Sequence, residues 1–298
     1  MTRQLDPRLR EGPFRGSLAV AECLVTSNQL RSGQFVRLVR DAYVHVDVPV
    51  THQLRCHAAS LIVPAEAALT GRSAAVVRGV PLADTWDPIE VAVPEKYRFV
   101  SARDLTIRRV VSAPVEQRYS QGLALTTPER MCFDVTVATK LEEAVADMDA
   151  VLHHRVLDAG AAQRYLAGSH ERGVRHARRV LALADDRAES RPESITRVVL
   201  VRDGLHPVPQ LEIFDTRGFV ARVDLGFEEA KVAVEYEGIW HGQPQQVPRD
   251  RTRLNKLHAA GWHVVFVTAG QLRTDRAGVI EMVRAALRRA ARSPRTAS

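Results

Sequence analysis

Cysteine, lysine and aromatic residues are scarce in this chain of 298 residues, only 5% of which are aromatic. Its three cysteines, Cys23, Cys56 and Cys132, are odd in number and far apart. This spacing excludes a disulfide framework and a CxxC zinc site, and it fits a protein of the reducing cytoplasm. No apolar run reaches about 18 residues, so the sequence predicts no membrane span and no membrane partner.

The beginning of the chain resembles a secretion signal only superficially. Several arginines precede a short apolar stretch, residues 17–25, as they do in a signal peptide. Glu22 interrupts that stretch and no small-residue cleavage site follows it, so we expect no secretion and a cytoplasmic location.

Positive charge is concentrated at the two ends of the sequence. The net charge is +7, and residues 1–83 and 186–298 each carry four more positive than negative side chains. Residues 84–185 carry one more negative than positive side chain. Two basic ends predict two surfaces that bind a polyanion such as nucleic acid. A GC-rich genome, which favours arginine, would explain the same excess without a polyanionic partner.

Residues 1–83 contain the expected parts of a winged helix-turn-helix domain. The expected elements are helices at 17–25, 26–33, 51–63 and 65–78, and a β-hairpin at 35–46 with its turn at Arg40-Asp41. Arg31, Arg37 and Arg40 would then contact phosphates of two backbone strands of DNA. The alternative is a small helical cap whose arginines are merely solvated.

The rest of the chain predicts a connecting domain and then an α-β-β-β-α-β-α domain. Residues 84–125 alternate like strands, and residues 127–185 are helical in pattern. The elements expected after them are helix 190–203, strands 209–215, 219–227 and 231–237, helix 248–261, strand 262–267 and helix 276–292. We therefore expect an α/β (α+β) protein with three domains, 1–83, 84–185 and 186–298.

Two carboxylates are expected to face each other in the C-terminal domain. If the hairpin turns at Glu229-Ala230, Asp224 lies directly across from Glu235 on the same face of the sheet. Such a pair repels and would destabilise the strands by up to about 1 kcal/mol. A divalent cation reverses that penalty, and Mg²⁺ binds carboxylate oxygens together with substrate phosphate. The alternative is that the acids are solvated or paired with Arg222 and Lys231.

Further charged residues surround this pair in the sequence. Glu193 could project toward it from the preceding helix, although the Ser190–Glu193 spacing is also that of a capping box. An acid and an imidazole, Glu237 and His241, follow the third strand closely. The next helix carries a basic stripe made of Arg249, Arg253 and Lys256. Acids that hold a metal beside cations that hold a phosphate backbone are what metal-assisted phosphodiester cleavage needs.

One motif in this region is similar to a known nuclease family. Its members here are Asp224, Glu235-Tyr236-Glu237-Gly238, His241, Asp250, Arg253, Leu257 and Gly261-Trp262-His263-Val264. In order and spacing they resemble the Vsr-like branch of the PD-(D/E)XK nuclease superfamily, whose core has the same α-β-β-β-α-β order. The resemblance covers roughly residues 190–270.

The resemblance implies roles for individual residues. It makes Asp224 and Glu235 the metal-binding acids, with Mg²⁺ or Mn²⁺ as the cofactor, and Glu193 the acid borne by the helix. Glu237 occupies the position where the superfamily name has lysine. Activation of the attacking water would then fall to His241 or to Glu237 acting as a base.

The N-terminal region resembles a second family. The segment Arg37-Leu38-Val39-Arg40-Asp41-Ala42-Tyr43-Val44 looks like the wing of the winged-helix domain in AbiEi-family antitoxins. The segment from Gly122 to Arg130 resembles a later part of those chains. Asp41 stands where such proteins often have glycine, which leaves the geometry of the turn open.

Two functions follow from these expectations. The first is a metal-dependent endonuclease that hydrolyses phosphodiester bonds of double-stranded DNA, with winged-helix DNA binding by the N-terminal domain. The second is an AbiEi-like antitoxin or transcriptional repressor whose nuclease core is catalytically inactive. The sequence leaves a homodimer open.

Overall fold

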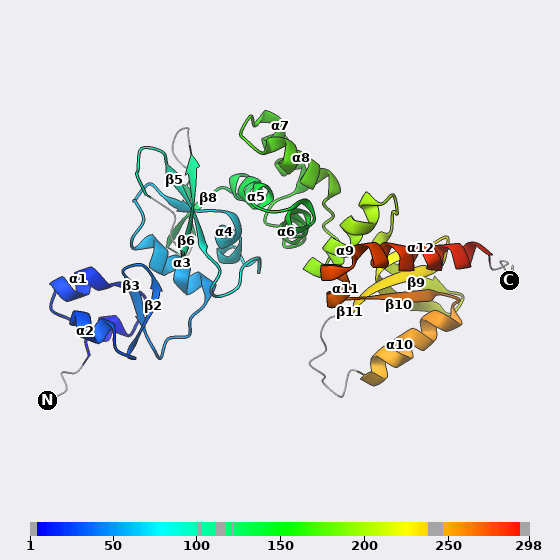
Figure 1. Ribbon diagram of the computed structural model, residues 1–298, viewed down its shortest axis with the longest axis horizontal. Helices are drawn as coiled ribbons and strands as arrows, with labels where there is room; N and C mark the ends of the chain where they lie inside the picture. The colour runs from blue at the N-terminus through cyan, green and yellow to red at the C-terminus, as the bar shows by residue number, and fades with distance from the viewer. Residues whose placement is uncertain (1–4, 100–102, 111–116, 121, 238–246, 293–298) are drawn as a thin grey trace. The chain divides into compact units, whose positions relative to one another are not determined.

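The computed structural model describes residues 5–99, 103–110, 117–120, 122–237 and 247–292. Two compact units make up the chain, each of which combines helices with a β-sheet (Figure 1). Unit 1 contains Met1–Ala138 and His154–Ala177, and unit 2 contains Thr139–His153 and Arg178–Ser298. The predicted α/β (α+β) class is confirmed.

The first elements of unit 1 have the order of a winged helix. They are η1 Pro7–Leu9, β1 Phe14–Arg15, α1 Gly16–Ala21, α2 Ser27–Leu30, β2 Phe35–Val39 and β3 Ala42–His45. The strands form an antiparallel sheet in the order β1-β3-β2, and apolar side chains of the helices and of β2 share one core. Both helices end earlier than expected, α1 at Ala21 and α2 at Leu30. Thr26 and Gln29 form a capping box at the start of α2, which has a single turn.

The turn of the β2–β3 hairpin is built on Asp41. Its φ of 63° is left-handed, a conformation that Asp tolerates better than most residues. Its carboxylate accepts hydrogen bonds from the Ser17 amide (2.8 Å), the Ser17 hydroxyl (2.6 Å) and Arg15 Nε (3.0 Å). Asp41 therefore closes the turn without glycine and fixes the hairpin to the start of α1.

A five-stranded sheet fills the remainder of unit 1. Its order is β6-β5-β4-β8-β7, made of β4 Ala68–Leu69, β5 Ile89–Pro94, β6 Leu105–Val110, β7 Gln117–Ser120 and β8 Leu123–Thr126. The helices of this part are α3 His52–Ser60, α4 Gly71–Val77, α5 Pro128–Val137 and α7 Ala159–Gly168, and α8 Val174–Leu183 continues into unit 2. The helix expected at 51–63 corresponds to α3. The expectation of a helix at 65–78 is wrong in its first part, because residues 68–69 form β4 and α4 begins only at Gly71.

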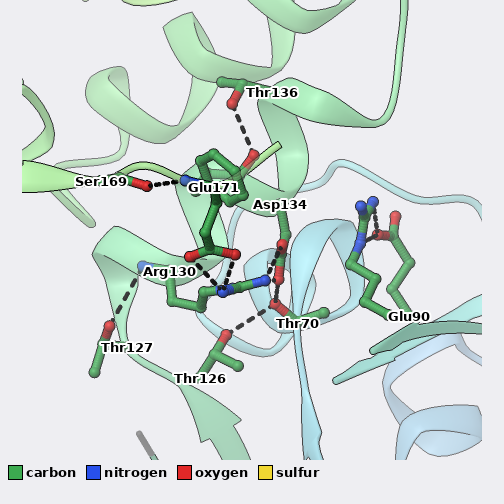
Figure 2. Close-up of polar contacts among 11 residues, drawn as sticks. Thr70, Glu90, Thr126, Thr127, Arg130, Asp134, Thr136, Ser169 and Glu171 are labelled. Atoms are coloured by element: carbon green, nitrogen blue, oxygen red, sulfur yellow. Dashed lines mark hydrogen bonds and ion pairs between the residues drawn. The ribbon is translucent and has the colours of Figure 1, made fainter. Parts of the chain in front are cut away.

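A buried polar network connects β4, β8 and α5 (Figure 2). Thr70 donates a hydrogen bond to the Asp134 carboxylate (2.5 Å) and accepts one from Thr126 (3.0 Å). Arg130 binds both Asp134 oxygens (3.0 and 3.1 Å) and both Glu171 oxygens (2.9 Å). Asp134 is 1% exposed, so these hydrogen bonds offset the cost of burying its carboxylate.

From α9 onward, unit 2 has the expected element order with one helix, α11, added. It contains α6 Leu141–His153, α9 Arg191–Arg202, β9 Val208–Asp215, β10 Gly218–Phe227, β11 Val232–Glu237, α10 Val247–Ala259, β12 His263–Thr268, α11 Ala269–Thr274 and α12 Arg276–Arg292. The sheet order is β12-β11-β10-β9, with β11 and β12 parallel and the other neighbours antiparallel. The short helix α11 was not expected.

Apolar residues cover both faces of this sheet. One core joins α9, α11 and α12 to β10, β11 and β12, with Leu200, Leu225, Val234 and Val283 among its members. The other core places Leu257 of α10 against the sheet. Helix α6 lies in the predicted middle domain, yet it belongs to unit 2, where Asp149 binds Arg197 of α9 (2.8 Å).

None of the helices in the described part of the chain is long and apolar enough to cross a membrane.

Candidate acidic site

The strand register of unit 2 brings the two predicted acids together. Strands β10 and β11 pair Leu225 with Val234 and Phe227 with Val232. Extended by one residue, this register sets Asp224 opposite Glu235. The turn therefore lies at residues 229–230, as the sequence predicts.

A third polar residue completes the row. Strand β9 pairs Leu211 with Val223 and Pro209 with Leu225, which sets Gln210 opposite Asp224. Gln210 has a φ of 51°, a left-handed conformation that strains a residue with a side chain. Its amide Nε2 donates a hydrogen bond to Glu193 Oε2 (2.7 Å). Gln210 was not predicted as a site residue, because hydrophobic periodicity carries no signal for an irregular strand position.

Glu193 connects α9 to this row. The hydroxyl of Ser190 caps the helix by accepting from the Glu193 amide (3.4 Å), so the Ser190 half of the predicted capping box is present. The Glu193 carboxylate is directed elsewhere, since it accepts from Gln210 and from the Glu189 amide (3.2 Å). The residue therefore serves the helix cap with its backbone and the acidic row with its side chain.

Asp224 is the most perturbed acid of the site. Burial, together with the nearby charges of Glu193 and Glu235, raises its pKa to about 6. A hydrogen bond from the Tyr236 amide to Asp224 Oδ2 (2.9 Å) and the charge of Arg253 oppose this rise. Three carboxylates thus lie close enough to repel one another, the electrostatic condition that a bound cation relieves.

Glu235 is held by a residue predicted to contact DNA. Arg253 Nη1 and Nη2 donate to the two Glu235 oxygens at 2.5 Å each, and Nη1 also donates to the Arg222 carbonyl (3.2 Å). Glu235 is 5% exposed. Arg253 therefore lies within the acidic site. The cations expected as alternative partners of the acids bind other groups: Arg222 binds Glu189 (2.9 Å), and Lys231 donates to the Ala260 carbonyl (3.2 Å).

The side chains that could hold a divalent cation here are the carboxylates of Asp224, Glu193 and Glu235. Within the part of the chain that the structure describes, no three His, Cys, Asp or Glu side chains are arranged as a metal site. The chemistry of the set nevertheless fits one: Asp224 and Glu193 are carboxylates under mutual repulsion, and an ionised carboxylate has about four lone-pair positions. Glu235 can therefore accept the Arg253 fork and still offer lone pairs to an ion.

The other predicted site residues are spread over both units. Glu237 is exposed at the end of β11, and Lys256 is exposed on α10. In unit 1, all three predicted DNA contacts are exposed; they are Arg31, Arg37 and Arg40. His241 and the side chain of Arg249 lie outside the described residues.

The comparisons with known proteins leave the function open. No model of a known protein family matches the sequence. Two uncharacterized proteins of Mycobacterium tuberculosis, MT2308 of strain CDC 1551 / Oshkosh and Rv2248 of strain ATCC 25618 / H37Rv, are 35% identical to it over 163 residues. The match spans 53% of this chain and 59% of each relative.

One solved structure aligns with part of this chain. The RV2827C protein of Mycobacterium tuberculosis aligns with a TM-score of 0.41 at 16% identity. The alignment covers 59% of this chain and 73% of that one. A likeness of this size supports no functional argument.

Proposed function

We propose that the protein is a metal-dependent endonuclease that hydrolyses phosphodiester bonds of double-stranded DNA in the cytoplasm. The observation that carries the proposal is the acidic row. Asp224 has a pKa of about 6 because it is buried and because Glu193 and Glu235 lie close to it. Acids that repel one another on neighbouring strands are unfavourable for folding alone, and they match a cation that binds phosphate.

Asp224, Glu235 and Glu193 would hold Mg²⁺, or Mn²⁺ in its place. The ion supplies polarisation of the phosphate and a lower pKa of bound water. In the hydrolysis, a water oxygen would form a bond to phosphorus while the bond to one ester oxygen breaks, and the leaving oxygen would take a proton from solvent. Glu237 or His241 would accept the proton of the water, and Lys256 and Arg249 would hold neighbouring phosphates.

The N-terminal winged helix would hold the duplex or select the site. Its element order and the exposure of Arg31, Arg37 and Arg40 support this assignment. The excess of positive charge at both ends of the chain is consistent with two surfaces on DNA. A homodimer is an open part of the same proposal.

A binding protein is the second candidate. An AbiEi-like antitoxin or transcriptional repressor could use the C-terminal core only to grip DNA. The ion pair between Glu235 and Arg253 favours this reading, because it already neutralises one of the acids.

Cleavage of DNA by the purified full-length protein distinguishes the two candidates. Supercoiled plasmid and linear duplex would be incubated with Mg²⁺, Mn²⁺ or EDTA. We expect nicking that requires the metal and that Asp224→Asn abolishes while DNA binding persists. Glu212→Gln is the matched control, because Glu212 is an exposed acid of the same sheet. Binding without cleavage in all metals would favour the repressor.

A further inference from the structure

A phosphate that approaches the acidic row meets a large electrostatic barrier. The carboxylates of Glu193 and Glu235 act on that of Asp224, and a phosphodiester brings a further negative charge. Residues of α10 lie against this part of the sheet, and three of their basic side chains are described. They are Arg251, Arg253 and Lys256. Arg251 and Lys256 are exposed, whereas Arg253 is bound to Glu235.

We infer that Arg253 receives the scissile phosphate, so that its guanidinium is the cationic group of the site. This assignment rests on the proposed nuclease function. The sequence predicts only that Arg253 helps to hold the phosphate backbone. The structure places its guanidinium in contact with Glu235, one of the acids of the site.

The position of Arg253 is fixed from both sides. One turn later on α10, Leu257 is completely buried in the core against the sheet. The guanidinium itself is fixed by the two Glu235 oxygens and the Arg222 carbonyl. A planar group held in this way keeps its orientation before substrate binds, which reduces the entropy lost on binding.

Arg253 also lies at the boundary between the buried acids and water. Its side chain is 35% exposed, whereas that of Glu235 is 7% exposed. A phosphate reaching Asp224 and Glu235 from solvent would therefore encounter this guanidinium, a group suited to bind phosphate oxygens.

The alternative is a purely structural ion pair, in which Arg253 only neutralises buried Glu235. The two roles differ in what each variant loses. A structural pair contributes to stability and not to phosphate binding. A phosphate-binding residue contributes to DNA affinity without metal and to the rate with metal.

The test uses the full-length chain with Arg253→Lys, Arg253→Ala and a control, Arg288→Ala, which removes an exposed arginine of α12. Binding to a 30-base-pair duplex is measured in EDTA over a salt series. We expect both Arg253 variants to bind about tenfold more weakly at low salt. The salt slope should fall by about one for Arg253→Ala and stay unchanged for Arg253→Lys, which keeps the positive charge. We expect the control to change neither quantity.

The second measurement is metal-dependent nicking. Removing one donor to the reacting phosphate is expected to slow cleavage about 10²–10³-fold. Added guanidinium chloride should restore part of the rate of Arg253→Ala, whereas NaCl at the same ionic strength should not. A rescue of this kind requires a vacant place at the reacting phosphate, which a structural pair does not create.

The outcomes separate this inference from the nuclease proposal. If the wild type does not cleave DNA, the nuclease proposal fails, and the EDTA binding series still tests whether Arg253 contacts phosphate. If the Arg253 variants bind with wild-type affinity and slope, the inference is wrong. Should Arg253→Ala not fold, the double variant Glu235→Gln/Arg253→Gln removes both charges and takes its place in the binding series.

Discussion

Substitution of Asp224 by Asn should stabilise the protein, and the gain should depend on pH. Burial and two neighbouring carboxylates raise the pKa of Asp224 from 3.8 to about 6. In the unfolded chain the same carboxyl ionises near its ordinary pKa. The folded protein therefore holds the ionised form at a cost that asparagine does not have, while the amide oxygen can still accept the Tyr236 N–H.

The sign and size of the effect follow from linkage. A carboxyl with a raised folded pKa contributes its full stability below pH 3.8 and loses it as the pH rises through about 6. The shift corresponds to about 2–3 kcal/mol of unfolding free energy above pH 7. The advantage of Asp224→Asn over wild type should therefore grow between pH 4 and about 7 and then remain constant.

Urea unfolding of wild type, Asp224→Asn and the control Glu212→Gln at pH 5 and pH 8 measures this difference. We expect the control to show no such growth, because Glu212 is exposed. Added Mg²⁺ should stabilise the wild type by mass action and the variant much less. If Asp224→Asn gains no more at pH 8 than at pH 5, the acids do not repel as described and the argument for a cation site is refuted.

Three further changes test other parts of the molecule. Asp134→Asn should lower the unfolding free energy by about 3–5 kcal/mol in urea titrations, since it leaves buried Arg130 without its main partner. Glu171→Gln changes the half-exposed partner of Arg130 and should cost less than about 1 kcal/mol. Glu237→Lys changes an exposed residue, so nicking should be preserved or increased; its abolition would instead identify Glu237 as the base. Joint replacement of the exposed residues Arg31, Arg37 and Arg40 by alanine should weaken binding to duplex DNA and change the unfolding free energy by no more than about 0.5 kcal/mol. Unchanged DNA affinity would assign the winged helix to another partner.

Local periodicity was sufficient to predict most of unit 2. Alternation of apolar and polar residues located β10 and β11, and the length of the connection between them placed the turn at residues 229–230. Because side chains alternate with a period of two, this turn also placed Asp224 opposite Glu235. In unit 1, the polar break at Arg40-Asp41 located the turn of the hairpin, whereas the hydrogen bonds of Asp41 to Ser17, 24 positions earlier, could not be predicted from it.

The contents of the acidic site were decided by tertiary structure. Gln210 joins the row through its pairing opposite Asp224 and its hydrogen bond to Glu193 of α9, and alternation within one strand cannot predict a contact with a helix. Arg253 has a long side chain that could have reached solvent phosphate or a buried acid from the same helical position. The packing of Leu257 against the sheet orients α10 so that Arg253 bonds to the buried acid Glu235.

The division of the chain into units was also beyond the sequence. The composition of residues 84–185 predicts one connecting domain, yet Leu141–His153 folds with unit 2. Ion pairs of α6 with α9 hold it there, between residues that lie 44 or more positions apart. The sequence by itself determined the order of helices and strands and the facing acids, because these depend on short-range spacing. Only the folded chain decided which distant charges neutralise one another, because that choice depends on burial and on backbone geometry that neighbouring residues do not fix.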